Sequence, residues 1–87
     1  MATEYRSRSG LLERDIQTYT ELLWQSVQDG ELDPKDEHFP LRAVAHIRES
    51  FNLSIRDGAA CVERFQTNYK QQLKSLGCKH FIGAAAD

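Results

Sequence analysis

The sequence predicts an all-α fold, with three helices packed into one compact domain. Three observations lead to this prediction. Apolar residues recur every three or four positions in three segments, which is the spacing of one face of an α-helix. Residues that favour helix starts and helix ends flank these segments. The 87 residues, 40% hydrophobic and 28% charged, match the size and composition of one folded domain.

The longest pattern predicts a central helix over residues 54–76. Its apolar stripe consists of Ile55, Ala59, Val62, Phe65, Tyr69, Leu73 and Leu76. Ser54 and Asp57 form a capping box at the start, and Gly77 suits the position just after a helix end. Without interruption this helix would be about 34 Å long. We expect Val62 and Phe65, at its middle, to lie in the core.

Another helix is expected over residues 11–28. Its stripe consists of Leu12, Ile16, Tyr19, Leu23 and Val27. Ser9 is a candidate cap, and Gly30 is a plausible stop. Leu22 and Trp24 lie off the stripe, which indicates either a second neighbouring element or a contact with a partner.

The remaining helix is expected over residues 40–51, with a stripe of Leu41, Val44, Ile47 and Phe51. Residues 52–53 leave room only for a tight turn before Ser54, so the segment 40–76 should form a helical hairpin. Gly58 lies where the two helices of this hairpin would cross. A small residue there lets two backbones approach closely, which compensates for the low helix propensity of glycine.

The domain is expected to cover residues 11–77, between a flexible leader at 1–10 and a loose tail at 78–87. Residues 84–87 are expected to be disordered. The connection at 29–40 contains five carboxylates and should be a solvated acidic loop, with a short extra turn near 33–38. It lacks the residue order of an EF-hand calcium loop.

The charge distribution argues against some classes of partner. The net charge is −2, which favours neither nucleic acid nor an anionic membrane. The acidic residues gather in the first half and the basic residues in the second, so the two halves could attract each other, within one chain or between two. No apolar run is long enough to cross a membrane, and the N-terminus lacks the apolar core of a secretory signal. We therefore expect a cytoplasmic protein.

No motif indicates an enzyme, a metal site or a cofactor. His38, His46 and His80 lack the spacing of zinc ligands, and Cys61 and Cys78 form no Cys-x-x-Cys pair. His46 and Cys61 could approach each other within the hairpin, but a catalytic pair would also need an orienting group and an oxyanion site. We expect a structural cysteine and no catalysis.

Residues 43–63 resemble the helical hairpin in the C-terminal domain of bacterial ribosomal stalk proteins. The matching positions are Ala43-Val44, Ile47-Arg48, Leu53-Ser54-Ile55 and Val62-Glu63. The strand that precedes the hairpin in that family is missing, and so are its lysine-rich factor-binding positions. The resemblance therefore implies a helical hairpin and carries no function to this chain.

The predicted function is that of a small non-enzymatic protein–protein interaction module: a regulator, adaptor or inhibitor. The apolar residues least explained by the stripes are the candidate partner-binding residues, namely Trp24, Leu22, Phe81 and Ile82. Trp24 could instead cover the rim of the core. Phe81 and Ile82 either fold back over the bundle or form a short docking peptide. The sequence does not identify the partner.

Two further predictions concern the helix 54–76. Its later turns carry Tyr69, Leu73 and Leu76, which predict self-association as a homodimer unless the helix 11–28 covers them. The alternative function is a DNA-binding transcriptional regulator that reads DNA with this helix. Its exposed positions would be Ser54, Arg56, Asp57, Ala60 and Arg64, although the acidic balance argues against nucleic acid.

Overall fold

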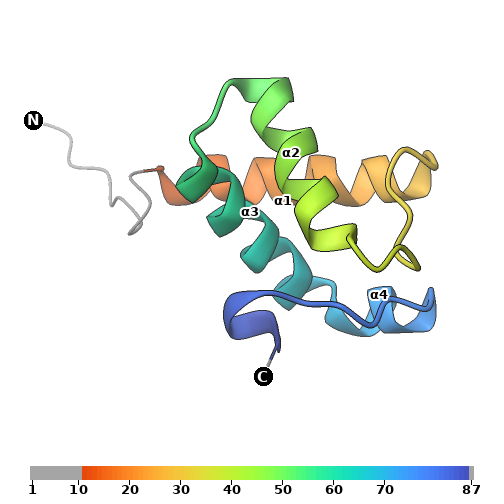
Figure 1. Cartoon of the computed structure of the whole chain (residues 1–87). Helices are drawn as coiled ribbons and strands as arrows, with labels where there is room; N and C mark the ends of the chain where they lie inside the picture. The colour runs from red at the N-terminus through yellow and green to blue at the C-terminus, as the bar shows by residue number, and fades with distance from the viewer. Residues whose placement is uncertain (1–10, 87) are drawn as a thin grey trace, which may run out of the picture.

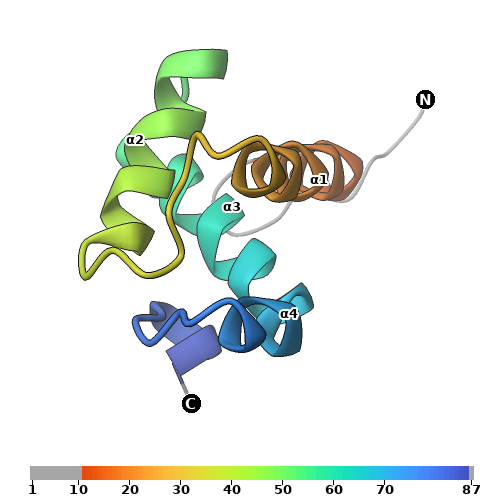
Figure 2. The same ribbon diagram turned by 90° about the vertical axis from the view of Figure 1, so that its right-hand side faces the viewer.

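Helix α3 (Ile55–Asn68) lies at the centre of the computed structural model, and the other helices all contact it. α1 (Glu13–Gln28) crosses one side of α3, α2 (Phe39–Phe51) lies on another, and α4 (Lys70–Ser75) follows after a bend (Figures 1 and 2). The structure describes residues 11–86, which contain no strand, so the all-α prediction is confirmed. The predicted leader at 1–10, the Ser9 cap and Asp87 lie outside these residues.

The core forms where α1, α2 and α3 meet. Val62 and Phe65 are fully buried, as predicted, and Leu23 and Ile47 join them from the flanking helices. Burial of large apolar side chains is the main force that holds such a domain together. No helix in the described part of the chain is long and apolar enough to cross a membrane.

Four residues assigned to the predicted stripes lie at the surface instead: Leu41, Phe51, Ile55 and Leu76. Leu41 and Ile55 are both 65% exposed. On α2 the core face runs through the fully buried Ala43 and Ile47, and Leu41 lies two residues, or about 200° around the helix, from Ala43. Ile55 is the first residue of α3, where the helix begins. The side chain of Phe39, ahead of the predicted start of α2, is buried in the core.

The hairpin between α2 and α3 forms as expected. Asn52 ends α2 in the left-handed conformation, at φ 55°, and the Ser54 hydroxyl accepts a hydrogen bond from the Asp57 backbone N–H at 3.1 Å. A Cβ on Gly58 would lie only 2.6 Å from Cγ of Arg48. A side chain at this position would force Arg48 to move, so glycine lets the two helices approach closely at this crossing.

The predicted helix over 54–76 is interrupted at Tyr69, so a single long helix is the wrong description. Tyr69 has φ −111° and ψ 24°, and α4 leaves in a different direction from α3 (Figure 1). The Thr67 hydroxyl donates to the Glu63 carbonyl oxygen at 2.8 Å, a contact that favours bending of helices. Asn68, which follows, is a weak helix former.

The tertiary contacts of Tyr69 hold this bend in place. Its ring stacks on Trp24 of α1, with centroids 4.8 Å apart and planes 7° apart, and contacts Phe65 at 5.6 Å. Beyond the bend, α4 turns Leu73 into the core, where it is fully buried. The bend interrupts the helix, and the stacking of Tyr69 on Trp24 and the burial of Leu73 compensate for this interruption.

The acidic loop makes two consecutive turns before α2. The backbone N–H of Asp36 donates to the Asp33 carbonyl oxygen, and that of Phe39 donates to the Asp36 carbonyl oxygen, both at 3.0 Å. The carboxylates of Asp33 and Asp36 also accept backbone N–H groups two residues ahead, as Asx turns do. The extra turn expected near 33–38 is therefore present.

The C-terminal segment packs on α3, and the expectation of disorder is wrong for residues 84–86. Gly83–Ala86 forms a short 3-10 helix, η1, in which Ala85 is buried. The fully buried side chain of Gln66 donates to the His80 carbonyl oxygen at 2.8 Å and accepts the Ile82 N–H at 3.0 Å. Glu63 accepts the Ala84 N–H at 2.6 Å. These bonds satisfy backbone groups of a segment that has little regular structure.

Candidate functional site

A groove between α1 and α2 has large apolar side chains at its edge. Its volume is about 240 Å³, and we call it the α1–α2 groove. The residues that line it are Leu22, Gln25, Ser26 and Asp29 from α1 and His46, Ile47, Ser50 and Phe51 from α2. The groove exists because α1 and α2 both pack mainly on α3 and touch each other at few points.

Leu22 and Phe51 are the exposed apolar members of this groove. They are 41% and 40% exposed, although both belong to regular helices. The ring of Phe51 lies against Tyr19, with centroids 4.5 Å apart, so its position is fixed on one side. Buried Ile47 also lines the groove, so a ligand there would meet the edge of the core.

The polar centre of the groove is His46. Its Nε2 lies 3.0 Å from Oγ of Ser26 and 3.7 Å from Oε1 of Glu31. The Ser26 hydroxyl also lies 3.1 Å from the Leu22 carbonyl oxygen, to which it donates, and this leaves its oxygen able to accept a hydrogen bond from the imidazole.

This arrangement argues against a catalytic triad. A triad needs the serine and the carboxylate on opposite nitrogens of the imidazole, so that the histidine can remove the serine proton. Here Ser26 and Glu31 both approach Nε2, and the proton of Ser26 already serves the helix backbone.

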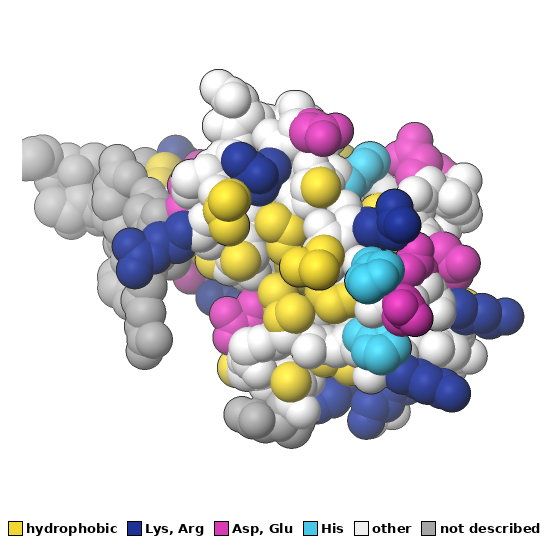
Figure 3. All heavy atoms as spheres, viewed as in Figure 1, with side chains coloured by type: hydrophobic (Ala, Val, Ile, Leu, Met, Phe, Trp, Pro, Cys, Tyr) yellow, Lys and Arg dark blue, Asp and Glu magenta, His cyan; other side chains and the backbone are white. Residues whose placement is uncertain are grey.

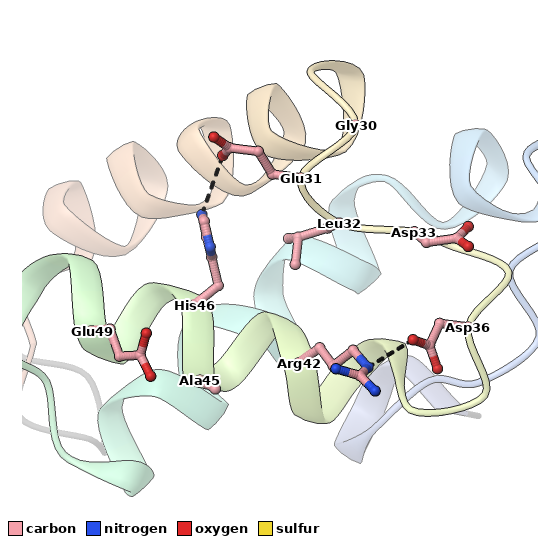
Figure 4. A pocket seen from close by; sticks show the side chains of 9 residues that line it. All are labelled: Gly30, Glu31, Leu32, Asp33, Asp36, Arg42, Ala45, His46 and Glu49. Atoms are coloured by element: carbon pink, nitrogen blue, oxygen red, sulfur yellow. Dashed lines mark ion pairs between the residues drawn. The ribbon is translucent and has the colours of Figure 1, made fainter.

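A second hollow, of about 420 Å³, lies beside the groove over the loop between α1 and α2 (Figure 4). We call it the acidic hollow; its residues are Gly30, Glu31, Leu32, Asp33, Asp36, Arg42, Ala45, His46 and Glu49. Nε of Arg42 lies 2.7 Å from Oδ2 of Asp36. The backbone N–H of His38, and then the charge of Arg42, lower the pKa of the Asp36 carboxyl. No group of residues between 11 and 86 has the arrangement of a metal site.

The cysteines have the properties of structural thiols. Cys61 is fully buried, and desolvation raises its pKa to about 12, so it is protonated at neutral pH. Burial also raises the pKa of Cys78. The imidazole of His46 is directed to Ser26 and Glu31 rather than serving as a base for Cys61.

The four candidate partner-binding residues do not lie together. Leu22 lines the α1–α2 groove, whereas Trp24 is half-buried and stacks on Tyr69 at the rim of the core. Phe81 and Ile82 are half-buried against the core, in the segment bound by Gln66. Phe51, which shares the groove with Leu22, was assigned by its spacing to the core stripe.

The self-association residues are also separated. Leu73 is fully buried within the single chain and offers no surface to a second copy, which corrects its predicted place in a seam. Tyr69 is half-buried next to Trp24, and Leu76 is 43% exposed. The predicted contact between two copies required a straight helix over residues 54–76, and the bend at Tyr69 means that this helix is not straight.

A second apolar surface covers the α2–α3 face. Figure 3 shows hydrophobic side chains gathered in the middle of this view, over α2 and α3. Among the large apolar residues of α2 and α3, Leu41 and Ile55 are the most exposed, at 65% each. Neither residue lines the α1–α2 groove or the acidic hollow.

The DNA-reading positions on α3 are partly occupied. Ser54 and Arg56 are exposed, whereas Asp57, Ala60 and Arg64 are half-buried. Arg64 donates a hydrogen bond to the Glu13 carboxylate of α1, which lowers the pKa of Glu13. The guanidinium of Arg64 is therefore already bound within the domain.

Comparisons of this chain with protein-family models, with curated proteins and with solved structures found no match. Its function must therefore be argued from the geometry and chemistry of these surfaces.

Proposed function

We propose that this protein is a small non-enzymatic protein–protein interaction module, a regulator, adaptor or inhibitor that binds its partner through the α1–α2 groove. One observation supports this proposal above the others. Leu22 and Phe51 are large apolar side chains that are 41% and 40% exposed on opposite sides of one concave surface. Aromatic and aliphatic side chains at the rim of a pocket are typical anchors of protein interfaces.

The size of the groove favours a protein partner over a small molecule. Pockets that enclose a drug-sized ligand have volumes of about 300–1,000 Å³. The α1–α2 groove, at about 240 Å³, is smaller and has room for a few side chains of a partner. Binding there would cover the apolar surface of Leu22 and Phe51, which gives the contact its free energy.

The test begins with a photoreactive amino acid placed at position 51 in the native cell. A partner captured there, and not from the exposed position Gln71 on α4, is purified and its affinity is measured by calorimetry. Leu22→Ser and Phe51→Ser should each weaken binding by about tenfold or more, as truncation of interface anchors does. The control Ile55→Ser removes an even more exposed apolar side chain that does not line the groove, and it should leave affinity unchanged. Unchanged affinity in both groove variants would exclude the groove.

We further propose a cytoplasmic location and a homodimer. The dimer is now best sought through Leu76, because Leu73 is buried. Light scattering after size exclusion measures the mass of the assembly, and Leu76→Lys should reduce it to that of one chain if Leu76 lies in the contact.

The alternative proposal, DNA binding through α3, gains from one observation. The bend at Tyr69 shortens α3 to 14 residues, a length closer to that of a recognition helix. Its exposed cation is Arg56, since Arg64 is bound to Glu13. Fluorescence anisotropy with a labelled duplex at two salt concentrations tests it: specific binding should weaken as salt rises, and Arg56→Ala should reduce it.

A further inference from the structure

The α1–α2 groove and the acidic hollow form adjoining parts of one surface. Both are lined by His46, and Asp29 of the groove is followed directly by Gly30 of the hollow. Figure 4 shows His46 on α2 directed toward Glu31, with Asp33, Asp36 and Glu49 around the same hollow. An occupant of the groove would therefore extend over carboxylates.

The charges of this combined surface are mostly negative. Five carboxylates and one guanidinium line it; the carboxylates are Asp29, Glu31, Asp33, Asp36 and Glu49. Arg42 is engaged with Asp36 at 2.7 Å. The nearby Lys35 is directed elsewhere, with its aliphatic stem beside Gly77. Cationic groups would therefore be attracted to this surface, and anionic groups would be repelled.

The backbone around the groove limits the form that a partner can take. The described residues contain no strand, so no strand edge is available to pair with an extended peptide. Recognition must come from side chains of α1 and α2. An amphipathic helix suits this surface because it presents apolar anchors on one face and charged residues beside them.

From these observations we infer that the partner segment is a basic amphipathic helix. Its apolar side chains enter the α1–α2 groove between Leu22 and Phe51, and its lysines or arginines lie against the carboxylates of the acidic hollow. This inference rests on the proposed function and names the chemistry of the partner. The apolar contact supplies most of the affinity, and the charges supply orientation and association rate.

The experiment uses the full chain and three synthetic peptides of 15 residues. The first has leucine at helical spacing and lysine elsewhere, the second replaces each lysine by glutamate, and the third has the composition of the first in scrambled order. Binding is measured by fluorescence anisotropy at low and high salt. The contact surface is mapped by backbone amide shifts in NMR spectra of the labelled protein.

The lysine peptide should bind and shift the amides of Leu22, Ile47 and Phe51. The glutamate and scrambled peptides should bind at least about tenfold more weakly, a difference of about 1.4 kcal/mol. Affinity for the lysine peptide should fall as salt rises, because salt screens exposed charges. Equal binding by the glutamate or the scrambled peptide overturns the inference, and so do shifts centred on Leu41 and Ile55.

Matched variants separate the electrostatic and the apolar contributions to peptide binding. Glu31→Gln/Glu49→Gln should weaken the lysine peptide severalfold and reduce its salt dependence. Asp15→Asn/Glu37→Gln removes the same charge outside both hollows and should have little effect. Leu22→Ser should weaken binding by about tenfold. Phe51→Leu retains an apolar side chain at the edge of the groove and should preserve most of the affinity. Circular dichroism of each variant shows whether a loss of binding comes from a general loss of folding.

The outcomes also distinguish this inference from the proposed function. If a partner captured at position 51 contacts it through an acidic or extended segment, the inference fails and the interaction module stands. If an identified partner binds Leu22→Ser and Phe51→Ser as tightly as the unaltered chain, the groove is not the binding site and the proposed function fails.

Discussion

The helical core and the C-terminal segment at 78–86 both pack on α3, but they depend on hydrogen bonds to different degrees. The core depends on fully buried apolar side chains such as Phe65. The C-terminal segment buries only the small side chains of Cys78 and Ala85, and it also depends on hydrogen bonds between its backbone and the side chains of Gln66 and Glu63. Apolar burial is shared among many neighbours, whereas each of these hydrogen bonds joins two groups. Loss of a core contact should therefore destabilise the whole domain, and loss of a polar contact should release one segment.

The largest effect is expected from Phe65→Ala. Removing this fully buried ring leaves a cavity at the centre of α3, which costs about 3–5 kcal/mol. Since a domain of this kind is stable by roughly 5–15 kcal/mol, much of its stability would be lost. Urea unfolding followed by circular dichroism measures the change. Ile55→Ala, on the exposed first turn of the same helix, should change stability little. Similar losses for both variants would contradict the assignment of the core.

The next largest loss of stability is expected from Gln66→Ala. The change removes the partner of the partly buried His80 carbonyl and Ile82 N–H, at about 0.5–1.5 kcal/mol for each hydrogen bond, and it leaves a cavity where the fully buried Gln66 side chain was, which adds to the loss. Hydrogen exchange of the Ile82 amide should accelerate strongly, while amides in the middle of α1 keep their protection. The control Thr67→Ala alters the exposed neighbour and should leave the Ile82 amide protected. Uniform acceleration across all helices would show that the segment is part of the cooperative core.

A smaller effect is expected from Gly83→Ala. Gly83 has φ 55°, and a Cβ there would lie 2.5 Å from Cδ of Glu63, the side chain that binds the Ala84 N–H. The change should cost about 1–3 kcal/mol, from backbone strain and from displacement of Glu63. Gly30→Ala is the matched control: Gly30 has φ 85° but no atom within 4 Å of the added Cβ. Thermal melting should show the larger loss for Gly83→Ala, and equal losses would leave no role for the contact with Glu63.

The smallest effect is expected from the ion pair between Glu13 and Arg64, which joins α1 to α3 at the surface. The hydrogen bond from Arg64 lowers the pKa of Glu13 in the folded state. Its stabilising contribution is therefore complete above the ordinary glutamate pKa of about 4.5 and is lost as pH falls through the lowered value. Glu13→Gln should slightly reduce stability at pH 7 and flatten the loss between pH 5 and 3. An unchanged acid profile would show that the pair contributes nothing.

The parts of the fold that depend on local spacing could be predicted from the sequence. The helices, the hairpin at Gly58 and the burial of Val62 and Phe65 follow from periodicity and from glycine and cap residues. Periodicity fails where the buried position is a small residue. Ala43 lies in the core while the larger Leu41 faces outward, so the core face of α2 is rotated away from the predicted stripe, although Ile47 belongs to both.

The bend at Tyr69 and the polar contacts of the C-terminal segment could not be predicted in the same way. The bend depends on stacking with Trp24, which is 45 positions earlier in the chain. Gln66 does leave a signal, because it is spaced four residues after Val62 and three before Tyr69, on the core side of α3. A polar residue in such a position needs a buried hydrogen-bond partner, and the backbone of a following segment is the nearest source.

Only one of the two exposed apolar residues of the α1–α2 groove could be recognised from the sequence. Leu22 stood out because it lies off its stripe, but Phe51 fits the stripe of α2 and gave no sign of exposure. Whether such a residue is covered depends on how far α1 and α2 separate above α3, which is a tertiary property. The acidic loop was recognised as charged, but its position beside the groove depends on the same packing.

The stacking of Trp24 on Tyr69 has an optical consequence. The chain contains a single tryptophan, and its indole lies parallel to a phenol ring at 4.8 Å. The near-ultraviolet dichroism and the fluorescence of this one chromophore therefore report where the α3–α4 junction meets α1. Far-ultraviolet dichroism follows all the helices instead. Coincident transitions of the two signals during unfolding indicate that the bend and the bundle melt as one unit, and an earlier change in the indole signal marks the release of α4.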